Sequence, residues 1–68
     1  MCEDEACLNG ADLRGANLQH VTLHRASLRG ANLEGANLEY AKFDDADFEG
    51  ANFTNVKIRI GNRSFILK

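Results

Sequence analysis

The chain is poor in cysteine and has no long apolar run. Cys2 and Cys7 are the only cysteines among 68 residues, too few for a disulfide framework, and a zinc site would need further ligands at a suitable spacing. No apolar run approaches the roughly 18 residues of a membrane span. Residues 1–7 lack the basic start and apolar stretch of a signal peptide. We therefore expect two free thiols, no membrane contact and a soluble protein of the cytoplasm.

The chain also lacks an excess of charge of one sign. Its net charge is −2 at pH 7, with 26% of the residues charged. A general nucleic-acid binder shows a basic excess, so the sequence predicts no nucleic-acid partner. Its length allows one small domain, and such chains usually depend on a staple, a cofactor or a partner for stability.

What the chain has instead is an apolar pair every five residues. Eleven consecutive five-residue units run from Ala6 to Ile60, and their first residue is alanine except at Val21 and Val56. The third residue is apolar in every unit. These third positions are Leu8, Leu13, Leu18, Leu23, Leu28, Leu33, Leu38, Phe43, Phe48, Phe53 and Ile58.

A period of five fits neither common secondary structure. On an α-helix, five residues advance about 500°, so successive third positions would be displaced by about 140° and form no stripe. On a flat strand, an odd spacing sends them to opposite faces. The first and third positions stay inward only if the chain turns a corner after each short strand. Glycines at the fifth position fit such a corner: Gly10, Gly15, Gly30, Gly35 and Gly50. The sequence therefore predicts an all-β solenoid with a narrow apolar core.

The charges indicate how many units make one coil. In stacked coils, residues one coil apart lie about 4.8 Å from each other. A separation of twenty residues gives five opposite-charge pairs and no like-charge pair, whereas fifteen gives two opposite and three like pairs. Twenty-five gives three opposite pairs and stays open. The pairs at twenty are Glu5–Arg25, Arg14–Glu34, Arg25–Asp45, Arg29–Glu49 and Glu39–Arg59, with His24 over Asp44 when protonated.

The repeat A-[DN]-[LF]-x-x resembles the pentapeptide-repeat family over residues 6–60. That resemblance implies a right-handed quadrilateral β-helix with four units per coil and the first and third residues inward. Eleven units then make just under three coils. We divide the chain into an N-terminal lead-in at residues 1–5, the solenoid at 6–60, and a cap or edge strand at 61–68.

The C-terminal segment breaks the repeat. Gly61-Asn62, between "KIRI" and "RSFILK", is typical of a two-residue hairpin turn. Phe65 and Leu67 share one face of the following segment, which either covers the end of the core or forms an edge strand that pairs with a second copy. Three phenylalanines near the C-terminal end, Phe43, Phe48 and Phe53, either seal the last coil or form a self-association surface. Members of the family dimerise through their C-terminal coils, so the resemblance implies a homodimer.

An outward column of fifth positions, His20–Tyr40–Ile60, is a candidate contact patch for a protein partner. The possible interface residues are therefore Tyr40, Ile60, Phe65 and Leu67. His20 and His24 are four residues apart, but they point outward from neighbouring faces and no carboxylate or cysteine completes a metal site. The hydroxyl side chains have no partnered base and acid. We predict no catalytic, cofactor-binding or metal-ligating residue, no cofactor and no small-molecule substrate.

These observations lead to a non-catalytic scaffold or protein–protein interaction module whose partner the residues do not name. The alternative is a DNA-mimicking inhibitor or modulator of a type II topoisomerase, because some bacterial members of the family are thought to act through their acidity. The acidic run here is Glu34, Glu39, Asp44, Asp45, Asp47 and Glu49. Most of these carboxylates lie one coil from an arginine in the predicted register, which favours a surface that neutralises itself.

Overall fold

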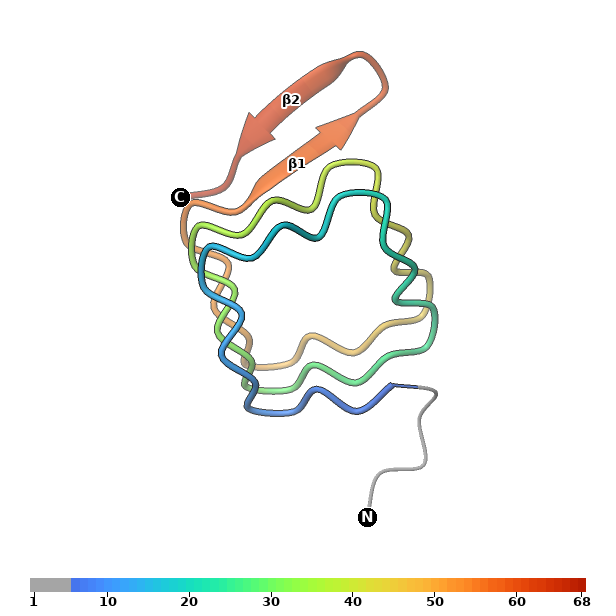
Figure 1. The fold of residues 1–68 in the computed structure, drawn as a ribbon, viewed down its shortest axis with the longest axis vertical. Coiled ribbons are helices and arrows are strands. Elements are labelled where there is room, and N and C mark those ends of the chain that lie inside the picture. The colour runs from blue at the N-terminus through green and yellow to red at the C-terminus, as the bar shows by residue number, and fades with distance from the viewer. Residues whose placement is uncertain (1–5) are drawn as a thin grey trace.

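The computed structural model describes residues 6–68, and in this range the chain contains strands and turns but no helix. The chain winds into coils that stack on one another, and a two-stranded hairpin leaves the last coil (Figure 1). The hairpin consists of β1 (Lys57–Ile60) and β2 (Arg63–Ile66). The all-β prediction is confirmed.

The coils are joined by parallel pairing between residues twenty apart. Third-position amides donate to the carbonyl nineteen residues on, as Leu8 N does to Ser27 O at 2.7 Å and Leu28 N to Asp47 O at 2.7 Å. Each unit therefore lies beside the unit four further along, which is the spacing that the charge pairs favour. The paired second positions are Cys7–Ser27, Asp12–Asn32, Asn17–Asn37, Thr22–Lys42, Ser27–Asp47, Asn32–Asn52 and Asn37–Lys57.

Every fifth position from Gly10 to Asn55 is a corner. The φ angles there lie between +59° and +74°, in the left-handed region that favours glycine. Each corner is closed by a turn bond such as that from Ala11 N to Leu8 O at 3.0 Å. Asparagine or aspartate at the second position adds a bond to the fourth-position amide, as between Asn32 Oδ1 and Glu34 N at 3.1 Å. The glycine corners are confirmed, and five other residues adopt the same angles: His20, Arg25, Tyr40, Asp45 and Asn55.

The core is most completely buried in the middle of the stack, because each end coil has a neighbour on one side alone. Of the predicted inward residues, four are buried: Leu23, Leu28, Leu33 and Leu38. Six others are partly buried and pack against them: Leu8, Leu13, Leu18, Phe48, Phe53 and Ile58. Ala26, Ala31, Ala36 and Val56 complete the buried cluster.

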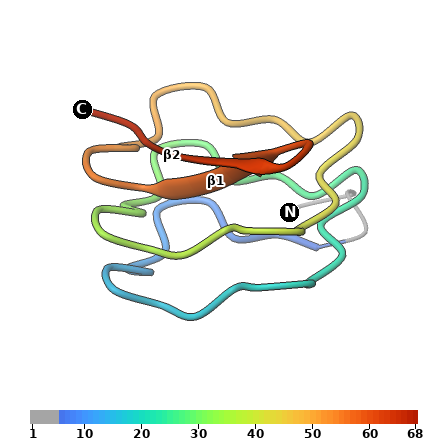
Figure 2. The same cartoon turned by 90° about the horizontal axis from the view of Figure 1, so that it is seen from above.

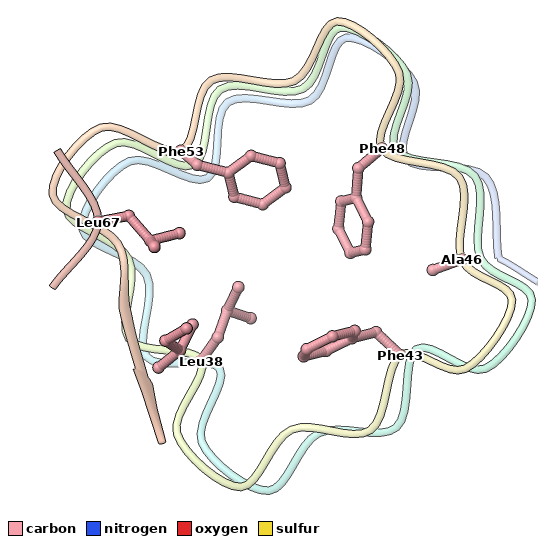
Figure 3. A pocket seen from close by; sticks show the side chains of 7 residues that line it. Leu38, Phe43, Ala46, Phe48, Phe53 and Leu67 are labelled. Atoms are coloured by element: carbon pink, nitrogen blue, oxygen red, sulfur yellow. The ribbon is translucent and has the colours of Figure 1, made fainter. Parts of the chain in front are cut away.

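Phe43 is predicted as a core residue, but the structure leaves it exposed. Its side chain points into the coil (Figure 3), yet the residue is 41% exposed. Residues 61–65 would lie over it if the coil continued, but the chain turns at Gly61 into the hairpin. Phe43 is therefore inward and uncovered.

The predicted charge pairs form only in part. Arg29 lies 3.7 Å from Glu49 and Arg59 lies 3.6 Å from Glu39, so these two pairs are confirmed. No ion pair joins Arg25–Asp45 or His24–Asp44 among residues 6–68, so these two predictions are wrong. Glu34 acts on Arg14 through its charge but forms no ion pair with it. Glu5, of the pair with Arg25, lies outside that range.

Arg14 binds Asp12 of its own unit instead. Both oxygens of the Asp12 carboxylate accept a bond of 2.8 Å from the guanidinium. This hydrogen bonding lowers the pKa of Asp12 to about 2. Asp47 has a comparable partner in Arg29. The Nε of Arg29 lies 2.6 Å from the Oδ2 of Asp47, and this hydrogen bond lowers the pKa of the Asp47 carboxyl. Residues two apart on an extended segment share a face, so Asp12 competes with the coil-to-coil partner of Arg14, whereas Arg29 and Asp47 lie in neighbouring coils.

Candidate interaction surface at the C-terminal end

The C-terminal end of the core is open. A hollow of about 300 Å³ lies there between the last strands, and only apolar residues line it (Figure 3). The rings of Phe43 and Phe48 meet edge to face with centroids 5.8 Å apart, and those of Phe48 and Phe53 at 5.1 Å. The phenylalanines contact one another without filling the end. The lining residues are Leu38, Phe43, Ala46, Phe48, Phe53, Ile58 and Leu67.

The hairpin forms at the turn that the sequence predicts. β1 and β2 are antiparallel, with Ile60 opposite Arg63 across Gly61-Asn62. Gly61 has a φ of +62° and Asn62 has no positive φ, which fits a turn with glycine at its first central position. The hairpin projects outside the ring of coils (Figure 1), and seen from above its two strands lie in front of the coils (Figure 2).

Only the last part of the hairpin segment returns to the core. Leu67 N donates to Val56 O at 2.8 Å, and Asn55 N donates to Leu67 O at 2.7 Å. The Leu67 side chain packs against the buried cluster. Phe65 is 42% exposed, so of these two residues Leu67 covers the core and Phe65 does not. Within residues 6–68, β2 pairs with β1 alone and is an edge strand.

Glu39 fastens the hairpin to the coils. Its side chain is only 8% exposed, and its Oε2 accepts a bond of 2.6 Å from the Ser64 hydroxyl. Lys57 Nζ and Arg59 Nη1 each lie 3.6 Å from the carboxylate. The hydrogen bond from Ser64, followed by the charges of Lys57 and Arg59, lowers the pKa of Glu39. A buried carboxylate with these partners ties both strands to residue 39.

We expect stability to decrease in acid as Glu39 takes up its proton. Its folded pKa lies below the ordinary 4.5, so its contribution is complete above that value and is lost as the pH falls through the lowered folded pKa. In Glu39→Gln, the free energy of unfolding should therefore decrease less between about pH 6 and about pH 3 than in the wild type. The decrease that remains is the one due to Asp12 and Asp47. Urea unfolding at the two pH values measures this. The control is Glu34→Gln, at an exposed carboxylate with no ion pair in residues 6–68, and equal pH dependence of both variants would contradict the role of Glu39.

The outward column beside the hairpin differs from its predicted composition. The rings of His20 and Tyr40 stack with centroids 4.8 Å apart and an interplanar angle of 3°. The guanidinium of Arg59 lies 5.1 Å from the centre of the Tyr40 ring, a cation–π arrangement. Ile60 is 65% exposed and belongs to the hairpin, so it does not extend the column. The sequence missed Arg59 here because the hairpin leaves the five-residue register at this point.

The described residues show no arrangement typical of a metal centre or a membrane segment. In the range 6–68, no group of three or more His, Cys, Asp or Glu side chains could hold a metal ion. Nor does this part of the chain include a helix able to cross a bilayer. Cys7 is an exposed free thiol, and Cys2 lies outside the described residues.

Comparison with known families assigns the fold. The sequence model of pentapeptide repeats (eight copies) matches residues 4–35 and 31–59, which together span most of the chain. The chain belongs to the pentapeptide-repeat family. No match was found to a curated protein or to a solved structure. The pentapeptide-repeat assignment agrees with the stacked coils, and identifies the chain as a β-rich repeat protein with a β-helical fold.

Proposed function

We propose that this pentapeptide-repeat protein is a non-catalytic interaction module that binds a second copy through its C-terminal end and acts as a scaffold. The observation that carries the proposal is the open apolar hollow, with Phe43 inside it and Phe65 exposed beside it. A contiguous apolar surface rimmed by polar residues is typical of a protein contact site. Burying this end against a second copy would remove it from water.

The proposal includes the finer shape of the solenoid. Pairing at a separation of twenty residues corresponds to four five-residue units per coil, which supports a right-handed quadrilateral β-helix. The eleven units of residues 6–60 then make just under three coils. An incomplete third coil would account for the uncovered Phe43.

The topoisomerase alternative has less support. A DNA mimic needs a continuous negative face, whereas residues 57–68 hold four cationic side chains and no acidic one. Asp47 and Glu49 are also paired with Arg29. Inhibition of a type II topoisomerase by micromolar protein would favour the alternative over the scaffold.

The oligomeric state tests the proposal. We expect light scattering after size exclusion to give a mass that rises with concentration from one chain toward two. Phe65→Glu should keep the fold, because the side chain is exposed, and should give a single chain at concentrations where the wild type is paired. Gln19→Glu, at another exposed position, in the first coil, is the control and should behave as wild type. A single-chain mass for the wild type throughout, or a paired mass for a folded Phe65→Glu, would contradict the proposal.

A further inference from the structure

The hairpin outside the ring of coils has one free strand edge. Among residues 6–68, β2 pairs with β1 alone, and β2 is the strand farther from the coils (Figure 1). In an antiparallel pair, residues whose backbone groups bond across the pair alternate with residues whose groups point away. Leu67 N donates to Val56 O at 2.8 Å, and this bond fixes the phase of the alternation. The backbone groups of Ser64 and Ile66 therefore point away from β1, toward the free edge.

The coils do not cover this edge. Within residues 6–68, neither the N–H nor the C=O of Ser64 or Ile66 bonds to backbone outside the hairpin. The hairpin is also held in place, because the Ser64 hydroxyl donates to Glu39 Oε2 at 2.6 Å. Unpaired groups along a fixed strand are a template for another extended segment. The edge is thus ordered before any segment binds, which lowers the entropic cost of binding.

The charge around the edge is positive, in a chain whose net charge is −2. Residues 57–68 hold four of the eight cationic side chains, whereas all ten carboxylate side chains lie in residues 1–56. Lys57 and Arg59 are partly neutralised by Glu39. Arg63 and Lys68 form no ion pair with a described residue. An occupant of the edge that carries carboxylates would supply the missing partners.

We propose that the free edge of β2 binds an extended acidic segment of a partner protein, which adds a third strand to the hairpin. The hollow in the core and the edge outside the coils are different surfaces, so this inference goes beyond the proposed self-association and does not rest on it. Backbone bonds to Ser64 and Ile66 hold the segment, and its side chains are selected by the four hairpin residues nearest to it. These are Arg63, Phe65, Ile66 and Lys68.

The spacing of those side chains predicts the sequence of the segment. Arg63 and Lys68 are five residues apart, and Phe65 and Ile66, which are both exposed, lie between them. A strand in register with β2 would place its first and sixth residues beside the two cations and its third and fourth beside the two apolar side chains. The expected pattern is acidic, any, apolar, apolar, any, acidic. It reads the same in both directions, so parallel and antiparallel segments fit equally.

The charges disfavour two other occupants of the edge. Pairing β2 with the β2 of a second copy would bring two basic hairpins together, and like charges across an interface cost affinity. A nucleic acid would extend past the hairpin over coils that carry the carboxylates of the chain, which repel its phosphates. A short acidic segment meets the positive hairpin alone.

A labelled peptide with the sequence ETVVTE tests the backbone pairing. We expect it to bind wild-type protein in a fluorescence anisotropy titration, and to bind about fivefold or more tightly than TEVVET, which has the same composition in another order. In hydrogen-exchange NMR, the Ser64 and Ile66 amides should become protected on binding, whereas the Phe65 amide, which faces β1, should change little. Binding without this protection would overturn the proposal.

Ile66→Pro removes the edge donor alone, because the amide of residue 66 points away from β1. We expect this variant to bind ETVVTE at least about tenfold more weakly than the wild type. Ile66→Val keeps the N–H and is the matched control, which should bind within about twofold of the wild type. Circular dichroism checks that both variants are folded. Equal binding by a folded Ile66→Pro would contradict pairing at this edge.

Charge reversal tests the role of the two cations. The double variant Arg63→Glu, Lys68→Glu should lose affinity for ETVVTE by about tenfold or more and should bind KTVVTK in its place. The control is Arg25→Glu, Lys42→Glu, which changes the net charge equally at two exposed cations of the coils that form no ion pair in residues 6–68. It should keep the wild-type preference. Equal effects of the two double variants would mean that net charge alone attracts the peptide, which overturns the site.

The remaining outcomes concern the other occupants. Loss of self-association in Ile66→Pro would assign the edge to a second copy, and displacement of ETVVTE by an equal concentration of a DNA duplex would assign it to nucleic acid. Either result overturns the acidic segment. No binding of ETVVTE at millimolar protein also removes the inference, and because the titration does not depend on pairing of copies, it leaves the proposed self-association standing.

Discussion

Replacing Leu33 with alanine is expected to lower the free energy of unfolding by about 3–5 kcal/mol. Leu33 is fully buried in the middle coil, with Leu13 in the coil before it and Phe53 in the coil after it. The coils are held rigidly by backbone bonds on both sides, such as that from Leu33 N to Asn52 O at 2.9 Å. The cavity therefore has little freedom to collapse. Since a domain of this size is stable by roughly 3–10 kcal/mol, this loss would remove a large part of its stability.

Leu13→Ala is the matched control, because it makes the same change in the same column. Leu13 lies in the first coil and is only partly buried, so we expect a loss of about 1–2 kcal/mol. Urea denaturation followed by circular dichroism measures both values. An equal loss at the two positions would mean that the middle coil is no better covered than the first, contrary to the burial described above.

The repeat alone predicted most of the fold. The third positions could be assigned as inward because an apolar side chain needs only removal from water, whichever neighbour provides it. The corners were less predictable. Residues such as His20 and Tyr40 adopt left-handed angles that cost about 1–2 kcal/mol for a residue with a side chain. The intrinsic backbone preference of these residues is against such angles, but the hydrogen bonds to neighbouring coils impose them.

Only some of the ion pairs could be predicted from the sequence. Counting opposite charges twenty residues apart in the sequence predicted the ion pairs Arg29–Glu49 and Glu39–Arg59. It missed the pair of Arg14 with Asp12, because two residues of one strand that share a face need no coil between them. Surface pairs of this kind contribute little to stability, so neither the fold nor the register depends on which partner is chosen.

The candidate site was the least predictable part. The sequence located the hairpin turn, but the direction of the hairpin depends on contacts between distant residues. Ser64 reaches Glu39 across 25 positions of the chain, and no local pattern marks that contact.

Leu67→Asp should be the most damaging single change in the C-terminal segment, with an expected loss of about 2–4 kcal/mol. Leu67 is the one residue of the segment beyond β2 whose side chain lines the hollow, and its backbone bonds to Val56 and Asn55 hold the end of the hairpin on the coil. A carboxylate there would lie among apolar side chains without a partner. The hairpin end would have to leave the core, exposing Val56, which is otherwise fully buried.

Ile66→Asp provides the adjacent control. Ile66 is 58% exposed and, as the neighbouring residue of an extended segment, points to the opposite face. The same change there should cost no more than about 0.5 kcal/mol. Both variants are compared by urea unfolding at one low protein concentration, so that pairing of copies does not contribute. Similar losses for the two would mean that Leu67 does not close the core, whereas a large loss at Leu67 alone would establish it as the cap residue.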